Sequence, residues 1–249
     1  MSTTLPAPDT DELERLSNLP TELALQRAVP FLAHLVSDSA FLDALALPLL
    51  KQAGTAEDWY VAHTYDGQDG SYSLQVFVWP PRTRTQIHDH TSWGAYCCVV
   101  GSVLEERYER LDDGSRLNHA RLKKLWQLSW SRGDGVSTVL PYDEGIHRVG
   151  NLGSKTAISV HLYGPQKGEF DGRDYDASRD YVCDRTEARQ SPKPQPLSTR
   201  VRASGSNPEW EFSESSALLT GAVAPELLWR RAGLASLSSA CRYSLAAVA

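Results

Sequence analysis

The sequence predicts an all-β core that follows a helical segment, and two observations carry this prediction. From residue 58 onward, short runs rich in β-branched and aromatic residues are separated by Gly, Pro, Asp and Asn, which is typical of a β-sandwich or barrel. Before residue 58 the chain instead has Leu- and Ala-rich stretches that follow helix-capping residues. The runs with the β pattern are YSLQVFVW, TQIHDH, AYCCVVGSVLEERYE, KLWQLSW, GVSTVL, HRVGN and TAISVHLYGP.

Residues 1–57 form the predicted helical segment. DTDELERL places capping residues before apolar positions, and SDSAFLDALALPLLKQAG has capping residues, an apolar body and a terminal glycine. Pro30 and Pro48 are expected to interrupt helices or start turns in this segment.

Residues 58–185 form the predicted barrel, which ends in a strap. The strap is the acidic and aromatic stretch EFDGRDYDASRDYVCD, which we expect to fold back over the barrel. Residues 186–249 begin with RQSPKPQPLSTRVRASGSNP, a composition typical of a flexible linker, so we expect a linker and tail there.

Charge and composition narrow the function classes. The net charge of −6 argues against nucleic acid or an anionic membrane as the main partner. The N-terminus lacks the pattern of a secretory signal, and no apolar run is long enough for a membrane span, so we expect a cytoplasmic protein. The four cysteines form no C-x-x-C pair, and adjacent Cys97 and Cys98 are expected to be buried free thiols.

Two histidines in TRTQIHDHTSWG have the spacing of a metal chelate. Side chains two apart on a strand share a face, so His88 and His90 should project together. Imidazole pairs suit iron, copper, nickel and zinc. Asp89 should then point to the other face and make a structural hydrogen bond.

A third histidine completes a familiar pair of motifs. GVSTVLPYDEGIHRVGN places His147 four residues before Asn151, and together with H-x-H this resembles the two motifs of the cupin superfamily. The likeness departs at P-Y-D-E-G, which is longer than usual. It departs again at Gly94 and Ala95, where a glutamate ligand is common. Loss of that carboxylate leaves three neutral histidines.

The departure points to one branch, since residues 58–166 resemble the cysteine dioxygenase family of thiol dioxygenases. The motifs that carry the resemblance are IHDH, W-G, V-x-G-x-x-x-E and GIHRVGN followed by S-x-H-x-Y-G-P, in that order. The resemblance implies a double-stranded β-helix barrel and non-haem Fe(II) held by His88, His90 and His147. It also implies an enzyme that uses O₂ to oxidise a small thiol, such as L-cysteine or 3-mercaptopropionate, to its sulfinate.

The stretch SVHLYGP supplies a second constellation. Ser159, His161 and Tyr163 alternate along a strand, so they share a face and can form a hydrogen-bond chain. The resemblance assigns these three residues a catalytic role, as a relay whose tyrosine reaches the reacting groups. The family's animal members crosslink this tyrosine to a cysteine, but that position is Ala95 here, so we expect no crosslink.

The residues that bind the substrate are harder to identify from the motifs. Family members hold the substrate carboxylate with an arginine or glutamine near the stretch that is Tyr60-Val61-Ala62-His63 here, and neither is present. Counting back by twos from His88 gives Arg84 on the same strand face, with His63 as a weaker candidate. Our hypothesis is that carboxylate capture moves to Arg84, and the competing interpretation makes Arg84 a solvated loop residue.

Two other function classes stay open. One is a different metal cupin, an isomerase or a dioxygenase acting on a carbon skeleton with Zn, Mn or Ni. The other is a non-catalytic cupin that binds a small ligand. Retention of S-x-H-x-Y favours the thiol dioxygenase, because neither alternative needs that chain.

Overall fold

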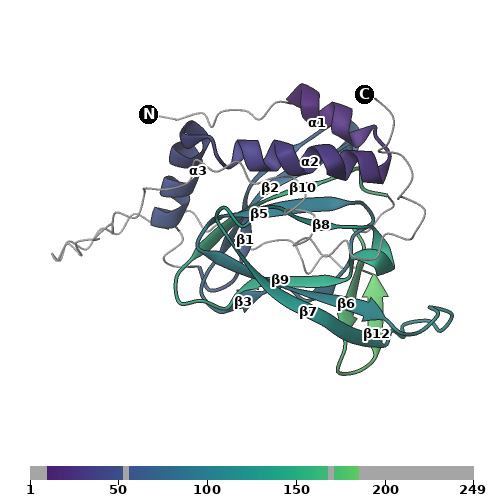
Figure 1. The fold of residues 1–249 in the computed structure, drawn as a ribbon. Helices are drawn as coiled ribbons and strands as arrows, with labels where there is room; N and C mark the ends of the chain where they lie inside the picture. The colour runs from purple at the N-terminus through teal and green to yellow at the C-terminus, as the bar shows by residue number, and fades with distance from the viewer. Residues whose placement is uncertain (1–9, 53–55, 168–170, 185–249) are drawn as a thin grey trace, which may run out of the picture. The chain divides into compact units, whose positions relative to one another are not determined.

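The structure is a computed structural model that describes residues 10–52, 56–167 and 171–184 (Figure 1). By internal contacts the chain divides into two units, and every described residue belongs to the first, 1–191. The linker and tail expected at 186–249 lie outside the described residues.

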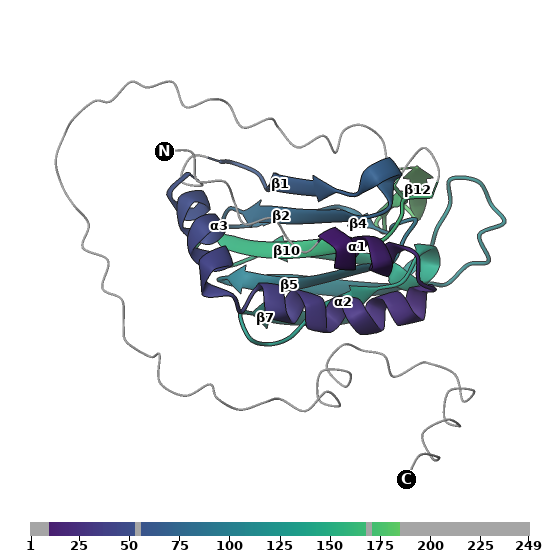
Figure 2. The ribbon, with the colours of Figure 1, turned by 90° about the horizontal axis from the view of Figure 1, so that it is seen from above.

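Three helices precede the strands, and they cover one sheet. Their buried apolar residues, such as Leu25, Leu32 and Phe41, share one core with Val76 and Val160 of the sheet below. Figure 2 shows these helices lying over that sheet. The helices are α1 (Thr10–Ser17), α2 (Thr21–Leu35) and α3 (Ser39–Gln52).

The expected interruptions at Pro30 and Pro48 were wrong, because both prolines lie inside helices, in α2 and α3. Burial of the apolar face against the sheet, rather than local propensity, sets the length of these helices. Within the residues that the structure describes, no single helix is long and apolar enough to cross a membrane. One bent pair, α2 with Ser39–Lys51, passes that test on length and composition only.

Two antiparallel sheets form the barrel, which confirms the predicted all-β core and its double-stranded β-helix arrangement. One sheet has the order β1-β2-β10-β5-β8, and the other has β12-β11-β4-β9-β6-β7 with β3 beside β9. The strands are β1 (Tyr60–Asp66), β2 (Ser73–Trp79), β3 (Thr83–Arg84), β4 (Ile87–His88), β5 (Gly94–Val100), β6 (Ser102–Arg110), β7 (Leu122–Ser131), β8 (Ser137–Val139), β9 (His147–Asn151), β10 (Ala157–Tyr163), β11 (Arg173–Asp176) and β12 (Tyr181–Asp184).

The alternation of side chains along β2, β5 and β10 separates two cores. One face of these strands packs under the helices, while the other contributes Phe77, Trp79, Tyr96 and Cys98 to a second cluster with Val149 of the opposite sheet. Aromatic side chains therefore line the space between the sheets. Polar residues that lie two apart on the same strands face into this space as well.

The stretch expected to be a strap contains the hairpin of β11 and β12, which extends the second sheet beside β4. Arg173 and Tyr175 of β11 both donate to the carboxylate of Asp89, at 2.6 and 2.7 Å. Gly172 has φ +85°, and a Cβ there would meet the Asp89 carbonyl oxygen at 2.2 Å. The hairpin therefore anchors the outward face of the H-x-H motif through Asp89.

Candidate metal centre and hydrogen-bond chain

Three buried histidines meet between the two sheets. His88 lies on β4 directly opposite His147 on β9, and His90 follows His88 by two residues. One ring nitrogen of each histidine lies within 4.8 Å of the others. The Nε2 atoms of His147 and His90 are 3.4 Å apart. Adjacent antiparallel strands thus bring together the residues that the sequence separates widely.

Each of these imidazoles is oriented by an acceptor at its Nδ1. The Nδ1 of His88 lies 2.9 Å from the carbonyl oxygen of Gln86, that of His90 lies 3.1 Å from Asp171 Oδ2, and that of His147 lies 3.3 Å from Glu105 Oε1. A carbonyl or a carboxylate only accepts, so a neutral histidine donates its Nδ1–H to it. The Nε2 lone pairs are then left for a metal, which is the usual outer arrangement of metal-binding histidines.

The protonation states fit such a site. Burial, with the nearby Arg107 cation, lowers the pKa of His147 to about 3 against the opposing effect of Glu105. Burial alone would raise the pKa of Glu105, but Arg107 and hydrogen bonds from His147 and Ser137 lower it to about 2. Neutral imidazole beside an ionised carboxylate is the state that binds a divalent transition metal. The donor set therefore fits a divalent transition metal, and the iron that the resemblance implies is one of these.

Glu105 is the centre of a buried hydrogen-bond network, and the sequence motifs did not identify it as a functional residue. It is fully buried, and its carboxylate accepts from Trp130 Nε1 at 3.0 Å and Ser137 Oγ at 2.7 Å, besides Arg107 and His147. The signal was present in the sequence, since Glu105 is the glutamate of V-x-G-x-x-x-E. Asp171, the partner of His90, had no such signal.

Ser159, His161 and Tyr163 form a continuous chain along β10. Ser159 Oγ lies 2.7 Å from His161 Nε2, and His161 Nδ1 lies 3.0 Å from the Tyr163 hydroxyl. Trp79 Nε1 extends the chain by donating to Ser159 Oγ at 2.7 Å. Burial, reinforced by His147 and His90, lowers the pKa of His161 well below its usual value, so His161 is neutral.

One arrangement of protons satisfies every group of this chain. Trp79 can only donate, so Ser159 accepts from it, and in this arrangement Ser159 directs its own proton to His161 Nε2. His161 then carries its proton on Nδ1 and donates it to the oxygen of Tyr163. This arrangement leaves the phenolic proton of Tyr163 for a group outside the chain.

One cavity, about 170 Å³ in volume, joins the two constellations. It is lined by all three histidines of the metal centre and by His161 and Tyr163, while Ser159 lies one step behind them. The other lining residues are Trp59, Val61, Gln75, Phe77, Trp79, Thr85, Val149 and Asp171.

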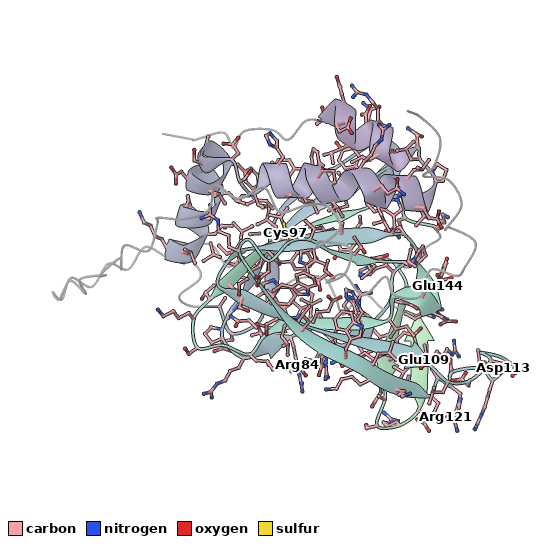
Figure 3. The ribbon with its side chains drawn as sticks, in the orientation of Figure 1. Arg84, Cys97, Glu109, Asp113, Arg121 and Glu144 are labelled. Carbon is pink, nitrogen blue, oxygen red and sulfur yellow. The ribbon has the colours of Figure 1, made fainter. Side chains whose placement is uncertain are left out.

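The hypothesis for Arg84 needs correction, because Arg84 is exposed and does not line the cavity. Figure 3 labels it on the outer side of the barrel. The count by twos assumed an unbroken strand, but β3 ends at Arg84 and β4 begins at Ile87. The break shifts the alternation, so Thr85 lines the cavity in place of Arg84.

His63 also lies outside the cavity lining. The register of β1 shifts between Val61 and His63, so that Val61 lines the cavity while His63 pairs with Val76. Val76 belongs to the core under the helices, and directly paired residues share a face. His63 therefore lies on the helix-covered face, where burial lowers its pKa.

No crosslink of Tyr163 is expected from the register of β5 and β10. Tyr163 pairs with Gly94, whereas Cys97 pairs with Val160 and Cys98 with Ser159, several residues further along the strand. We predict that a peptide map of the purified protein will show Tyr163 unmodified. A Tyr163 peptide joined to a cysteine peptide, lighter by the hydrogens lost, would contradict this placement.

Comparison with known proteins finds a family whose model matches the part of the chain that forms the barrel. Residues 54–175 match the model of the family described as cysteine dioxygenase type I. Among solved structures, a Thermus thermophilus protein is 15% identical with a TM-score of 0.31, covering 42% of this chain and 84% of its own. A cupin 2 barrel protein of Salinispora arenicola is 14% identical with a TM-score of 0.30, covering 43% and 73%. An oxalate oxidase in complex with glycolate is 16% identical with a TM-score of 0.35, covering 47% and 55%.

Proposed function

Because residues 54–175 belong to the cysteine dioxygenase family, we propose that this protein is a thiol dioxygenase that uses Fe(II) and O₂. The reaction is R–SH + O₂ → R–SO₂⁻ + H⁺. The O–O bond breaks, two S–O bonds form, and the sulfur loses the electrons that dioxygen gains. His88, His90 and His147 would hold the iron. Bound iron supplies the one-electron chemistry that dioxygen requires and a positive charge that favours the thiolate.

One observation carries the proposal: the histidine cluster and the Ser159–His161–Tyr163 chain line or support the same cavity. A site that only held a metal, or only a ligand, would have no use for a proton-carrying chain aimed into it. The Tyr163 hydroxyl can donate to an oxygen that gains negative charge, while His161 and Ser159 fix its orientation. Phe77, Trp79 and Val149 line the cavity with buried apolar side chains that exclude water.

Tyr163→Phe is expected to slow turnover by roughly 10–10⁴-fold, the range for losing a positioned proton donor or a group that stabilises an oxyanion. The ring and its packing stay, so iron content should match that of the native protein. Loss of the acceptor of the buried His161 Nδ1–H should lower the free energy of unfolding by about 1–3 kcal/mol. Tyr65→Phe is the matched control, since Tyr65 lies outside the cavity lining and packs against the core under the helices. Equal rates for native and Tyr163→Phe proteins would remove the proton donor from the proposal.

The function itself is tested by loading metal-free protein with Fe(II), Zn, Mn or Ni in turn and measuring oxygen uptake over a panel of small thiols. We expect uptake with iron alone, matched by sulfinate formation. Oxygen uptake with zinc, or no uptake with iron for any thiol, would contradict the thiol dioxygenase and favour one of the other cupin functions.

A further inference from the structure

The substrate cavity contains no arginine or lysine among its described lining residues. Its polar groups outside the histidines are those of Gln75, Thr85, Tyr163 and Asp171. Gln75 already donates to Ser73 Oγ at 2.9 Å, and Thr85 donates to the Val149 carbonyl oxygen at 3.3 Å. Among the described lining residues, a substrate carboxylate would meet few donors and no cationic side chain, and burial of a carboxylate without such partners is costly.

The nearest arginines cannot supply that cation without uncovering buried carboxylates. Arg107 lies behind His147, where it pairs with Glu105 and donates to the Thr138 carbonyl oxygen. Arg173 is shared between Asp89 and Asp143, at 2.6 and 2.7 Å. Neither arginine lines the cavity, and both are held by ion pairs with buried carboxylates.

The charged side chain that does line the cavity is acidic. Asp171 accepts from His90 Nδ1 at 3.1 Å and from the Thr91 backbone N–H at 3.4 Å, and its side chain is 39% exposed. A second cavity, of about 410 Å³, adjoins the first, since both are lined by Gln75, Tyr163 and Asp171. Asp66 lines this outer cavity as well. The two adjoining cavities are therefore lined by two carboxylates, and negative charge attracts cations.

The wall of the inner cavity favours a cation for a separate reason. Trp59, Phe77 and Trp79 form a contiguous aromatic group, with ring centroids 5.5 to 5.8 Å apart. Phe77 and Trp79 are stacked on each other and buried, whereas Trp59 is half-buried. The electron-rich face of an aromatic ring attracts ammonium groups, most strongly in the case of tryptophan. Aromatic faces beside a carboxylate are a usual combination for recognising an amine.

From these observations we infer that the substrate is a small aminothiol, whose second polar group is an ammonium and not a carboxylate. This inference rests on the proposed thiol oxidation and names the substrate class for the same site. The ammonium lies toward Asp171 and the aromatic wall, and the sulfur lies toward the three histidines. The reaction stays the one written above, with R carrying the ammonium.

The test compares three thiols of similar size with the iron-loaded protein: cysteamine with an ammonium, 2-mercaptoethanol with a hydroxyl, and 3-mercaptopropionate with a carboxylate. Oxygen uptake gives kcat/KM, and calorimetric titration without oxygen gives Kd independently of turnover. We expect cysteamine to exceed 2-mercaptoethanol by about tenfold in both, the size of a partly desolvated ammonium interaction. We expect 3-mercaptopropionate to be the poorest of the three.

Asp171→Asn separates the charge of Asp171 from its hold on His90, because the amide oxygen can still accept from the imidazole. The ratio of cysteamine to 2-mercaptoethanol should fall toward one in this variant, and the ratio cancels any change in iron binding. Arg84 lies on the outer side of the barrel, so Arg84→Ala should leave the ratio of cysteamine to 2-mercaptoethanol unchanged, both in kcat/KM and in Kd.

The possible results distinguish the proposed thiol oxidation from the inferred aminothiol substrate. Silence with all three thiols overturns the proposed function. Preference for 3-mercaptopropionate, or its selective loss in Arg84→Ala, overturns the aminothiol inference and leaves thiol oxidation standing. An unchanged ratio in Asp171→Asn also overturns the inference.

Discussion

His147→Ala is expected to lose both its metal and its oxygen uptake, because it removes one of only three ligand atoms that the described cluster offers. Loss of an outer hydrogen-bond partner alone costs roughly 10–100-fold in metal affinity, and loss of a ligand should cost more. The native protein should bind about one iron per chain, one ion for the one cluster that the described residues form. Iron content measured by mass spectrometry after dialysis checks this directly.

His34→Ala is the control for a histidine lost elsewhere. His34 lies exposed on α2 and belongs to no ligand cluster among the described residues, so its variant should keep full iron. His147→Ala with native iron content and native turnover would show that the cluster is not the metal site.

Glu105→Ala should give the largest loss of stability, about 3–5 kcal/mol in the free energy of unfolding of the metal-free protein. The substitution leaves the Arg107 guanidinium buried without its counter-charge, and it also removes the acceptor of Trp130 and Ser137. Urea unfolding followed by fluorescence measures the change. Replacing both members of the pair, as Glu105→Leu with Arg107→Met, should cost less than Glu105→Ala alone, since no unpaired charge remains.

Glu109 provides a matched control on the same strand. It is exposed on β6 (Figure 3), so Glu109→Ala should change the free energy of unfolding by no more than about 0.5 kcal/mol. A loss in Glu105→Ala as small as this would mean that the Glu105–Arg107 pair contributes nothing to the fold.

The sequence predicted correctly those side chains whose direction depends only on their alternation along one strand. His88 and His90 share a face, as do Ser159, His161 and Tyr163, because each set lies two apart on extended backbone. The motif order also placed His147 with the first pair, although only the pairing of β4 with β9 brings them together.

Sequence reasoning failed where the strand is irregular or the contact is distant. The break between β3 and β4 turns Arg84 outward, and the shift in β1 turns His63 toward the helices. No local pattern marks either irregularity. Asp171 reaches His90 across 81 positions of sequence, so no spacing rule could have paired them. The hypothesis that carboxylate capture moves to Arg84 assumed an unbroken strand, and the break between β3 and β4 is why it was wrong.

The most direct test of the central claim is the fate of both oxygen atoms. Iron-loaded protein is supplied with ¹⁸O₂ and with the thiol of the three that gives the fastest oxygen uptake, and the product is analysed by mass spectrometry. We predict a sulfinate that carries two heavy oxygen atoms, with oxygen uptake equal to the sulfinate formed. A disulfide product, or a sulfinate with one atom from water, would contradict a thiol dioxygenase.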